Sequence, residues 1–117
     1  MKRKFVAVGK VDDFPVGKGR KVVVDGREIA VFHLQEGFFA IDDTCPHQGA
    51  PLSYGIIDGF EVACPRHGAR FDLRSGQVLS LPAVRGVISY EVQVDKDMVF
   101  VCPEPMKDVP PALLIFP

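Results

Sequence analysis

The stretch KVVVDGREIAVFHLQEGFFAI, residues 21–41, decides the fold class of this chain. It holds two runs rich in β-branched and aromatic residues, 21–24 and 27–34, joined by Asp25-Gly26. Because Asp-Gly readily takes the positive φ values of a tight turn, the two runs are predicted to pair as a β-hairpin. Glu36-Gly37 separates the second run from a third at 38–41, so we expect a three-stranded meander.

The same kind of pattern recurs further along the chain. Asp58-Gly59 separates two short apolar runs at 56–57 and 60–63. Residues 87–94 nearly alternate in polarity, and a polar turn at 95–97 leads into a further run at 98–101. No window shows a sustained apolar period of 3.6, so no long helix is expected. The predicted fold class is all-β, a sandwich or small barrel of short antiparallel strands.

Composition limits the class of function. The chain has 117 residues, 47% of them hydrophobic, and a formal net charge of −1. This is enough for one core, and it gives no general attraction to nucleic acid or to anionic membranes. The basic start at 2–4 is followed by too few apolar residues for an export signal, and no run is long enough to span a bilayer. We therefore expect a cytoplasmic protein, in which three cysteines do not form a disulfide framework.

Two short segments carry the chemistry. They read Cys45-Pro-His47-Gln-Gly and Cys64-Pro-Arg-His67-Gly, so each joins one thiol to one imidazole. Two thiolates and two imidazoles suit either tetrahedral zinc or an iron–sulfur cluster with mixed ligands. Structural zinc sites commonly pair like ligands on one knuckle, whereas here both knuckles are mixed. A [2Fe–2S] rhomb with different ligands on its two irons has the matching asymmetry.

The sequences C-P-H-Q-G-A-P-L at 45–52 and C-P-R-H-G-A-R-F-D at 64–72 resemble the Rieske iron–sulfur family, with a looser likeness over about 3–102. The resemblance implies a Rieske-like antiparallel β-sandwich, with a cluster-binding subdomain of two loops at about 43–83. It also implies one [2Fe–2S] cluster, with one iron bound by two cysteines and the other by two histidines: Cys45, Cys64, His47 and His67. Leu81-Pro82-Ala83 matches the loop that covers the cluster. Residues 1–102 are expected to form a single domain and 103–117 a proline-rich, mostly irregular tail.

The loops also predict where the reduction potential lies. High-potential members of the family carry an extra cysteine in each loop, joined by a disulfide, and serine and tyrosine hydroxyls that bond to cluster sulfurs. This sequence has Ala50, Arg66, Ala69 and Phe71 at the matching positions. Fewer hydrogen bonds to sulfur stabilise the reduced state less, so we expect a potential toward the low end of the family's range.

The resemblance implies an electron carrier rather than an enzyme. The catalytic subunit of a Rieske oxygenase needs a second iron with two more histidines, and His33 is the only spare one. We expect one electron to pass from a flavin reductase to a terminal oxygenase. The alternatives are a small Rieske subunit of a nitrite reductase or other oxidoreductase complex, and, more distantly, a zinc-stabilised interaction module.

Several residues outside this constellation have ordinary interpretations. His33 is expected in a strand, and Cys102 as a partly buried thiol at a strand end. The arginines 66, 70 and 74 make the second loop locally basic, either to steer an acidic partner or as ordinary solvated charge. The apolar segment 112–116 is expected to pack on its own sheet or on a neighbouring molecule rather than to dock a partner.

Overall fold

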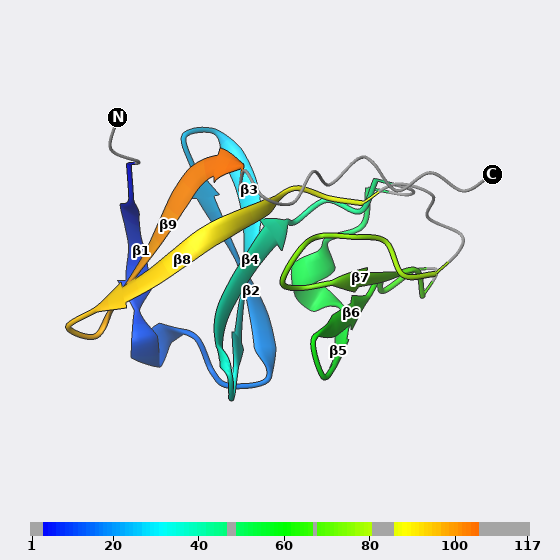
Figure 1. Ribbon diagram of the computed structural model, residues 1–117, viewed down its shortest axis with the longest axis horizontal. Helices are drawn as coiled ribbons and strands as arrows, with labels where there is room; N and C mark the ends of the chain where they lie inside the picture. Colours follow the sequence, from blue (N-terminus) through cyan, green and yellow to red (C-terminus); the bar gives the residue numbers. More distant parts are fainter. Residues whose placement is uncertain (1–3, 47–48, 67, 81–85, 106–117) are drawn as a thin grey trace.

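The computed structural model describes residues 4–46, 49–66, 68–80 and 86–105. Two antiparallel sheets make up these ranges (Figure 1). The larger has the strand order β1-β9-β8-β4-β3-β2, with β1 (Val6–Lys10), β2 (Lys18–Val24), β3 (Arg27–Leu34), β4 (Gly37–Asp42), β8 (Ser89–Asp95) and β9 (Met98–Pro105). The smaller has the order β5-β6-β7, with β5 (Ile56–Asp58), β6 (Glu61–Ala63) and β7 (Arg70–Asp72). The all-β antiparallel prediction is confirmed.

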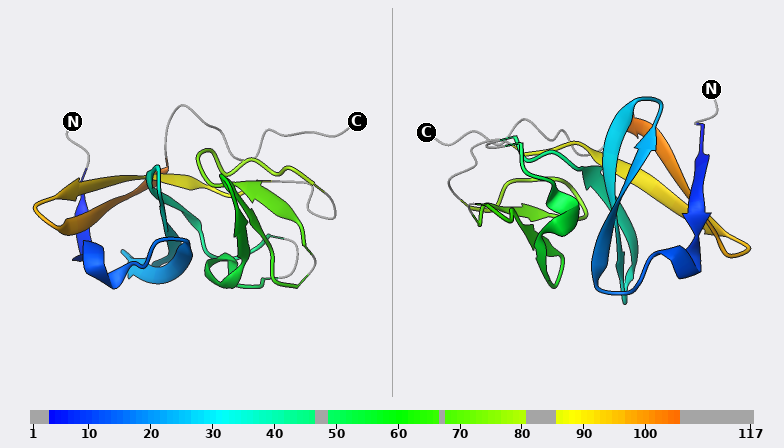
Figure 2. Two further views of the ribbon diagram at one scale, coloured as in Figure 1. Left: turned by 90° about the horizontal axis from the view of Figure 1, so that it is seen from below. Right: turned by 180° about the vertical axis from the view of Figure 1, so that it is seen from behind.

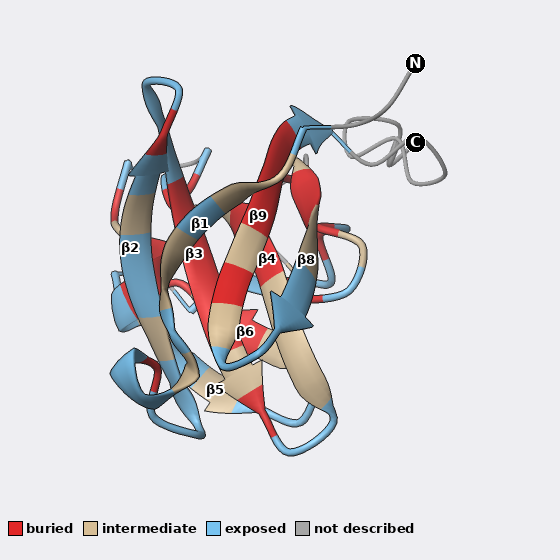
Figure 3. Ribbon diagram, turned by 90° about the vertical axis from the view of Figure 1, so that its left-hand side faces the viewer, coloured by how far each residue is buried: buried red, intermediate tan, exposed pale blue. Residues whose placement is uncertain are grey.

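The smaller sheet is inserted between two neighbouring strands of the larger one. The chain leaves the larger sheet at the end of β4 and returns to it at β8, which pairs with β4 through Ala40–Tyr90 and Ile41–Ser89. Figure 2 shows the two sheets side by side along the long axis of the molecule. The larger sheet is curled, so that its edge strands β1 and β2 approach each other (Figure 3). No helix among the described residues is long and apolar enough to cross a membrane.

The predicted hairpins are present, with one shift. Asp25 and Gly26 have φ values of 50° and 80° and join β2 to β3, and β4 completes the meander. Lys96 and Asp97, with φ of 48° and 68°, join β8 to β9. In the β5–β6 hairpin Asp58 pairs with Glu61, so the turn lies one residue later than expected.

Some elements were not predicted. These are strands β1 and β7 and two short 3-10 helices, η1 (Val11–Asp13) and η2 (Leu52–Tyr54). Strand β9 also continues to Pro105, where it pairs with Tyr90, so the irregular tail does not begin at Pro103 as expected. The strand tolerates its prolines near its end, where a missing N–H costs little. The apolar segment 112–116 and the covering loop 81–83 lie outside the described residues.

Strand β3 separates two hydrophobic cores. Its residues alternate, so that Ile29 and Val31 face the inside of the curled sheet while Ala30 and Phe32 face the smaller sheet. Burial on both faces explains why this strand reads as a continuous apolar run. The core between the two sheets contains Cys45, Leu52, Val62, Cys64, Phe71 and Leu73. Two of the proposed cluster ligands therefore belong to the core that joins the sheets.

Candidate metal centre

The first Cys-Pro segment forms a tight turn after β4. The N–H of Gly49 donates to the carbonyl of Cys45 at 2.8 Å, and the N–H of Cys45 donates to the carbonyl of Ala50 at 2.8 Å. Gly49 has a φ of 73°, in the left-handed region that glycine enters without steric cost. The cysteine side chain is buried, with 1% of its surface exposed. The five-residue motif at 45–49 thus corresponds to a defined five-residue turn.

The second Cys-Pro segment, between β6 and β7, repeats this geometry. The N–H of Gly68 donates to the carbonyl of Cys64 at 2.9 Å, and the N–H of Cys64 donates to the carbonyl of Ala69 at 2.7 Å. Gly68 has a φ of 74°, within one degree of its counterpart. Cys64 is 2% exposed and belongs to the same core as Cys45. The sequence repeat is therefore a structural repeat of two turns, each beginning at a buried thiol.

These turns fit the donor set that a mixed-ligand cluster needs. Each places a thiol on the core side of its loop, and thiolate sulfur is the ligand that iron–sulfur clusters use. His47 and His67 lie outside the described residues. Within the described ranges, which lack both histidines, no group of three or more His, Cys, Asp or Glu side chains is placed to hold a metal ion. Of the four predicted ligands, the structure therefore describes the two cysteines alone.

The side chains packed around the turns are apolar. Ala50, Ala69 and Phe71 are 5%, 0% and 0% exposed, and none of them carries a hydroxyl or a thiol. Ala69 and Phe71, where the resemblance places the serine and tyrosine hydroxyls of high-potential members, are therefore buried but lack a side-chain donor, and Ala50 takes the place of one disulfide cysteine. This agrees with the expected low potential, because side-chain hydrogen bonds to the cluster sulfurs would stabilise the reduced state.

Two of the three arginines near the second loop are neutralised locally. Arg70 donates through Nε to Glu61 at 2.8 Å, and this carboxylate raises the pKa of Arg70. Arg74 donates to Asp72 at 3.0 Å, and its guanidinium lies 4.2 Å from the centre of the Phe60 ring. Burial acts to raise the pKa of Asp72, but the bonds from Arg74 outweigh it and hold that pKa below its ordinary value. For these two arginines the structure favours local charge pairing over the steering of a partner.

His33 is in a strand as predicted, but Cys102 lies within β9 rather than at its end. His33 lies in β3, where its Nδ1 is 2.6 Å from the carbonyl oxygen of Phe14 and its ring stacks on Phe38 at 4.0 Å. Cys102 lies in β9 and is fully buried rather than partly buried. His33 lies in β3 and Cys102 in β9, so neither belongs to the two Cys-Pro turns.

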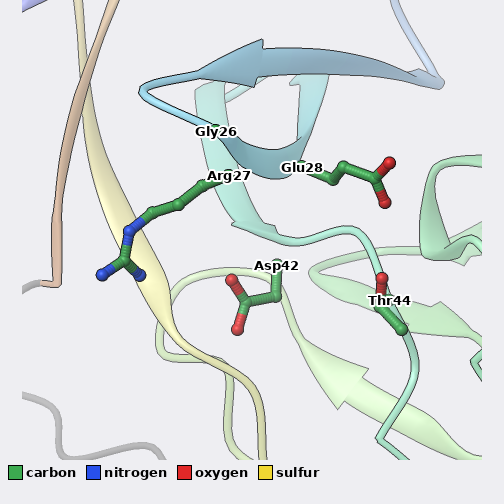
Figure 4. Close-up of a pocket in the computed structure, with 5 residues that line it drawn as sticks. All are labelled: Gly26, Arg27, Glu28, Asp42 and Thr44. Carbon is green, nitrogen blue, oxygen red and sulfur yellow. The ribbon is translucent and has the colours of Figure 1, made fainter.

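A polar network at the end of β4 was not predicted from the sequence. The hydroxyl of Tyr90 donates to Asp42 Oδ1 at 2.6 Å, and Arg27 donates to that hydroxyl at 3.3 Å. The N–H of Ile88 donates to Asp42 Oδ2 at 3.1 Å. Figure 4 shows Arg27 and Asp42 beside each other on the wall of a pocket, with Glu28 pointing away. The network ties β3, β4 and β8 together where the first cluster loop begins.

Comparisons with known proteins agree with this geometry. The model of the Rieske [2Fe–2S] domain matches residues 4–91. The ferredoxin component of naphthalene 1,2-dioxygenase/salicylate 5-hydroxylase systems from a Ralstonia species is 33% identical over 95 residues, which cover 81% of this chain and 91% of the relative.

Two solved structures are also similar. A structure of the complex of reduced oxygenase and oxidised ferredoxin in carbazole 1,9a-dioxygenase matches with a TM-score of 0.82 and 31% identity, covering 92% of this chain and 100% of the other. A protein named as the small subunit of an NADPH nitrite reductase matches with a TM-score of 0.75 and 31% identity, covering 84% and 97%. This chain therefore belongs to the Rieske [2Fe–2S] family and is a ferredoxin-type electron carrier with one [2Fe–2S] cluster.

Proposed function

We propose that the cluster is held by Cys45 and Cys64 on one iron and by His47 and His67 on the other. The observation that supports this assignment is the repeat of one turn geometry, each copy beginning at a buried thiol in a shared core. When bound, a [2Fe–2S] cluster accepts and returns one electron. Two thiolates and two neutral imidazoles balance the charge of the oxidised core, so the added electron enters a neutral site rather than a dianion.

The residues of the two turns provide a rigid site for this reaction, and the thiols in it are buried from solvent. The two thiols lie against apolar side chains, and the backbone bonds within each turn hold the loop in one conformation. Such a site changes little when its charge changes, which favours fast electron transfer. We further propose that residues 1–102 form one domain with a cluster-binding subdomain at about 43–83, and the insertion of the small sheet between β4 and β8 supports this division.

We propose a flavin reductase as the electron donor and a terminal oxygenase as the acceptor, both in the cytoplasm. The relatives named as ferredoxin components of dioxygenase systems and the solved ferredoxin–oxygenase complex support an oxygenase as the acceptor. A carrier that meets two partners in turn needs transient contacts, so each interface is expected to bury less than about 1,200 Å² in total.

The cluster and its ligands can be tested together. The purified chain should be red-brown and contain about two irons and two acid-labile sulfides per molecule, the stoichiometry of one [2Fe–2S] cluster. Cys45→Ala should abolish the cluster, whereas Cys102→Ala is the matched control, because it removes another buried thiol that lies in strand β9 and not in either Cys-Pro turn. One zinc per chain without sulfide or redox activity would instead support the interaction module and refute the carrier.

The second candidate is the small subunit of a nitrite reductase, which the 31% identity to such a protein favours. The two functions differ in the lifetime of the partner complex. A ferredoxin reduced by its reductase should transfer its electron to separately purified oxygenase and dissociate. A subunit should instead remain bound to a large catalytic subunit through size-exclusion chromatography, and that result would replace the proposed function.

A further inference from the structure

Asp43 is a buried carboxylate that closes the first cluster loop. It lies two residues before Cys45, and 2% of its surface is exposed. Its Oδ1 accepts the N–H of Ser53 at 2.8 Å, and its carbonyl accepts the N–H of Leu52 at 2.5 Å. Its own N–H donates to the carbonyl of Glu28 in β3 at 3.0 Å. One residue thus joins both ends of the loop to the larger sheet.

The second loop is held at its base in a different way. There the residues on either side of the turn continue as a ladder, with the pairs Ala63–Arg70, Val62–Phe71 and Glu61–Asp72. At the corresponding places in the first loop, Thr44 faces Pro51 in an isolated bridge, and Leu52 bonds to Asp43. Proline has no N–H to donate, and the chain then turns into η2, so no strand continues. The N–H of Ser53 is accepted by the Asp43 carboxylate, whereas its counterpart in the second loop, the N–H of Asp72, donates to the carbonyl of Gln77 at 2.9 Å.

We propose that Asp43 is a positioning residue for the cluster, because its carboxylate and its backbone hold the two ends of the first loop together and against β3. This rests on the proposed ligands Cys45 and His47, which both lie in the loop that Asp43 closes. Two turns with the same internal bonds are therefore supported unequally, and the first is the more easily opened. Loss of the carboxylate oxygen frees a buried N–H and loosens the base of the loop that supplies one ligand to each iron.

The test compares Asp43→Ala and Asp43→Asn with Asp72→Ala in the cluster-loaded protein. Asp72 is the matched control, because its carboxylate also accepts backbone N–H groups, from Arg74 and Ser75, in a turn on the far side of β7 from Cys64. Asp43→Ala should release iron to a chelator about ten-fold faster than the natural protein, since an unsatisfied buried N–H costs about 1–3 kcal/mol. It should also shift the electron paramagnetic resonance g-values. Asp43→Asn keeps an acceptor oxygen and should restore both, and Asp72→Ala should leave both unchanged.

Each outcome decides the proposal. Equal iron loss in Asp43→Ala and Asp72→Ala would overturn it, as would Asp43→Asn behaving like Asp43→Ala. If Asp43→Ala does not fold, hydrogen exchange of the natural protein decides: the Ser53 amide should be protected, and exchange at the rate of an open loop would refute the bond. A natural protein without a [2Fe–2S] cluster would instead refute the proposed function itself, so the two failures are distinguishable.

Discussion

Tyr90 carries the protein's clearest expected response to alkaline pH. Its side chain is 1% exposed, and its hydroxyl donates to Asp42 at 2.6 Å. Burial is the largest cause that raises its pKa, and the bond to Asp42 adds to it, while Arg27 acts in the opposite direction. The resulting pKa is about 12, against an ordinary value of 10.0. In the folded protein the proton is thus held more tightly than in the unfolded chain.

The sign and size of the effect follow by linkage. Because the pKa is higher in the folded state, the stabilisation is fully present below pH 10 and is lost as the pH rises through about 12. Two pKa units correspond to about 2.7 kcal/mol, and about half of this, ~1.4 kcal/mol, is lost at pH 11. The folded state at pH 11 should therefore have Tyr90 only about 10% ionised, whereas an unperturbed phenol would be about 90% ionised.

The assay is a titration of the phenol carbons by nuclear magnetic resonance on tyrosine-labelled protein. The chain has two tyrosines, so Tyr90→Phe assigns the signal unambiguously. Tyr54→Phe is the matched control for stability, because Tyr54 is exposed and contacts no such network. In the natural protein and in Tyr54→Phe, the urea midpoint of unfolding should fall steeply between pH 9 and 11. In Tyr90→Phe this fall should be absent. A Tyr90 that is mostly ionised at pH 11 in folded protein would refute the reasoning.

Three further results are expected. Gly19→Ala should lower the melting temperature, because the added Cβ would lie 2.6 Å from the Phe32 ring and 2.8 Å from the Ser53 carbonyl oxygen. Overpacking of this kind costs about 1–3 kcal/mol of stability. An unchanged melting curve would contradict this close approach. Ala69→Ser should raise the midpoint potential measured by voltammetry by about 40 mV, the equivalent of one hydrogen bond of about 1 kcal/mol to a cluster sulfur. An unchanged midpoint potential would mean that the serine hydroxyl does not reach a cluster sulfur. The midpoint of the natural protein should lie toward the low end of the Rieske range and fall as the pH rises through the pKa of the ligand imidazoles, so a flat profile into strongly alkaline pH would count against histidine ligation.

The sequence predicted those parts of the fold that depend on local chemistry. The Asp25-Gly26 hairpin was predictable because two residues with positive φ suffice to define its turn. Strand β7 was missed because its three residues lie inside the second motif and are recognisable as a strand only from their pairing with β6. Strand β1 was missed because it follows directly on the basic residues at the start of the chain. Its assignment as a strand depends on pairing with β9, which is far away in the sequence.

The residues of the candidate site also differ in how far the sequence identified them. Cys45 and Cys64 could be found from the sequence, because a repeated short motif reflects a repeated turn. The roles of Asp42 and Asp43 could not, because their partners are 10 to 48 residues away in the chain. Two adjacent acidic residues give no local sign that one binds a tyrosine and the other closes a loop. Their importance follows only from burial and from the pairing of strands.

The cluster-bearing part begins and ends on neighbouring strands, since β4 and β8 are hydrogen-bonded partners (Figure 1). Its two ends are therefore as close together as adjacent strands of any sheet, about 5 Å. Segments with such adjoining ends can be inserted into another protein without stretching the host. The region from Asp43 to Ile88 therefore meets the end-spacing condition for insertion between two antiparallel strands of another scaffold, but the recipient would have to supply the apolar face that Ala30, Phe32 and Ile41 provide here.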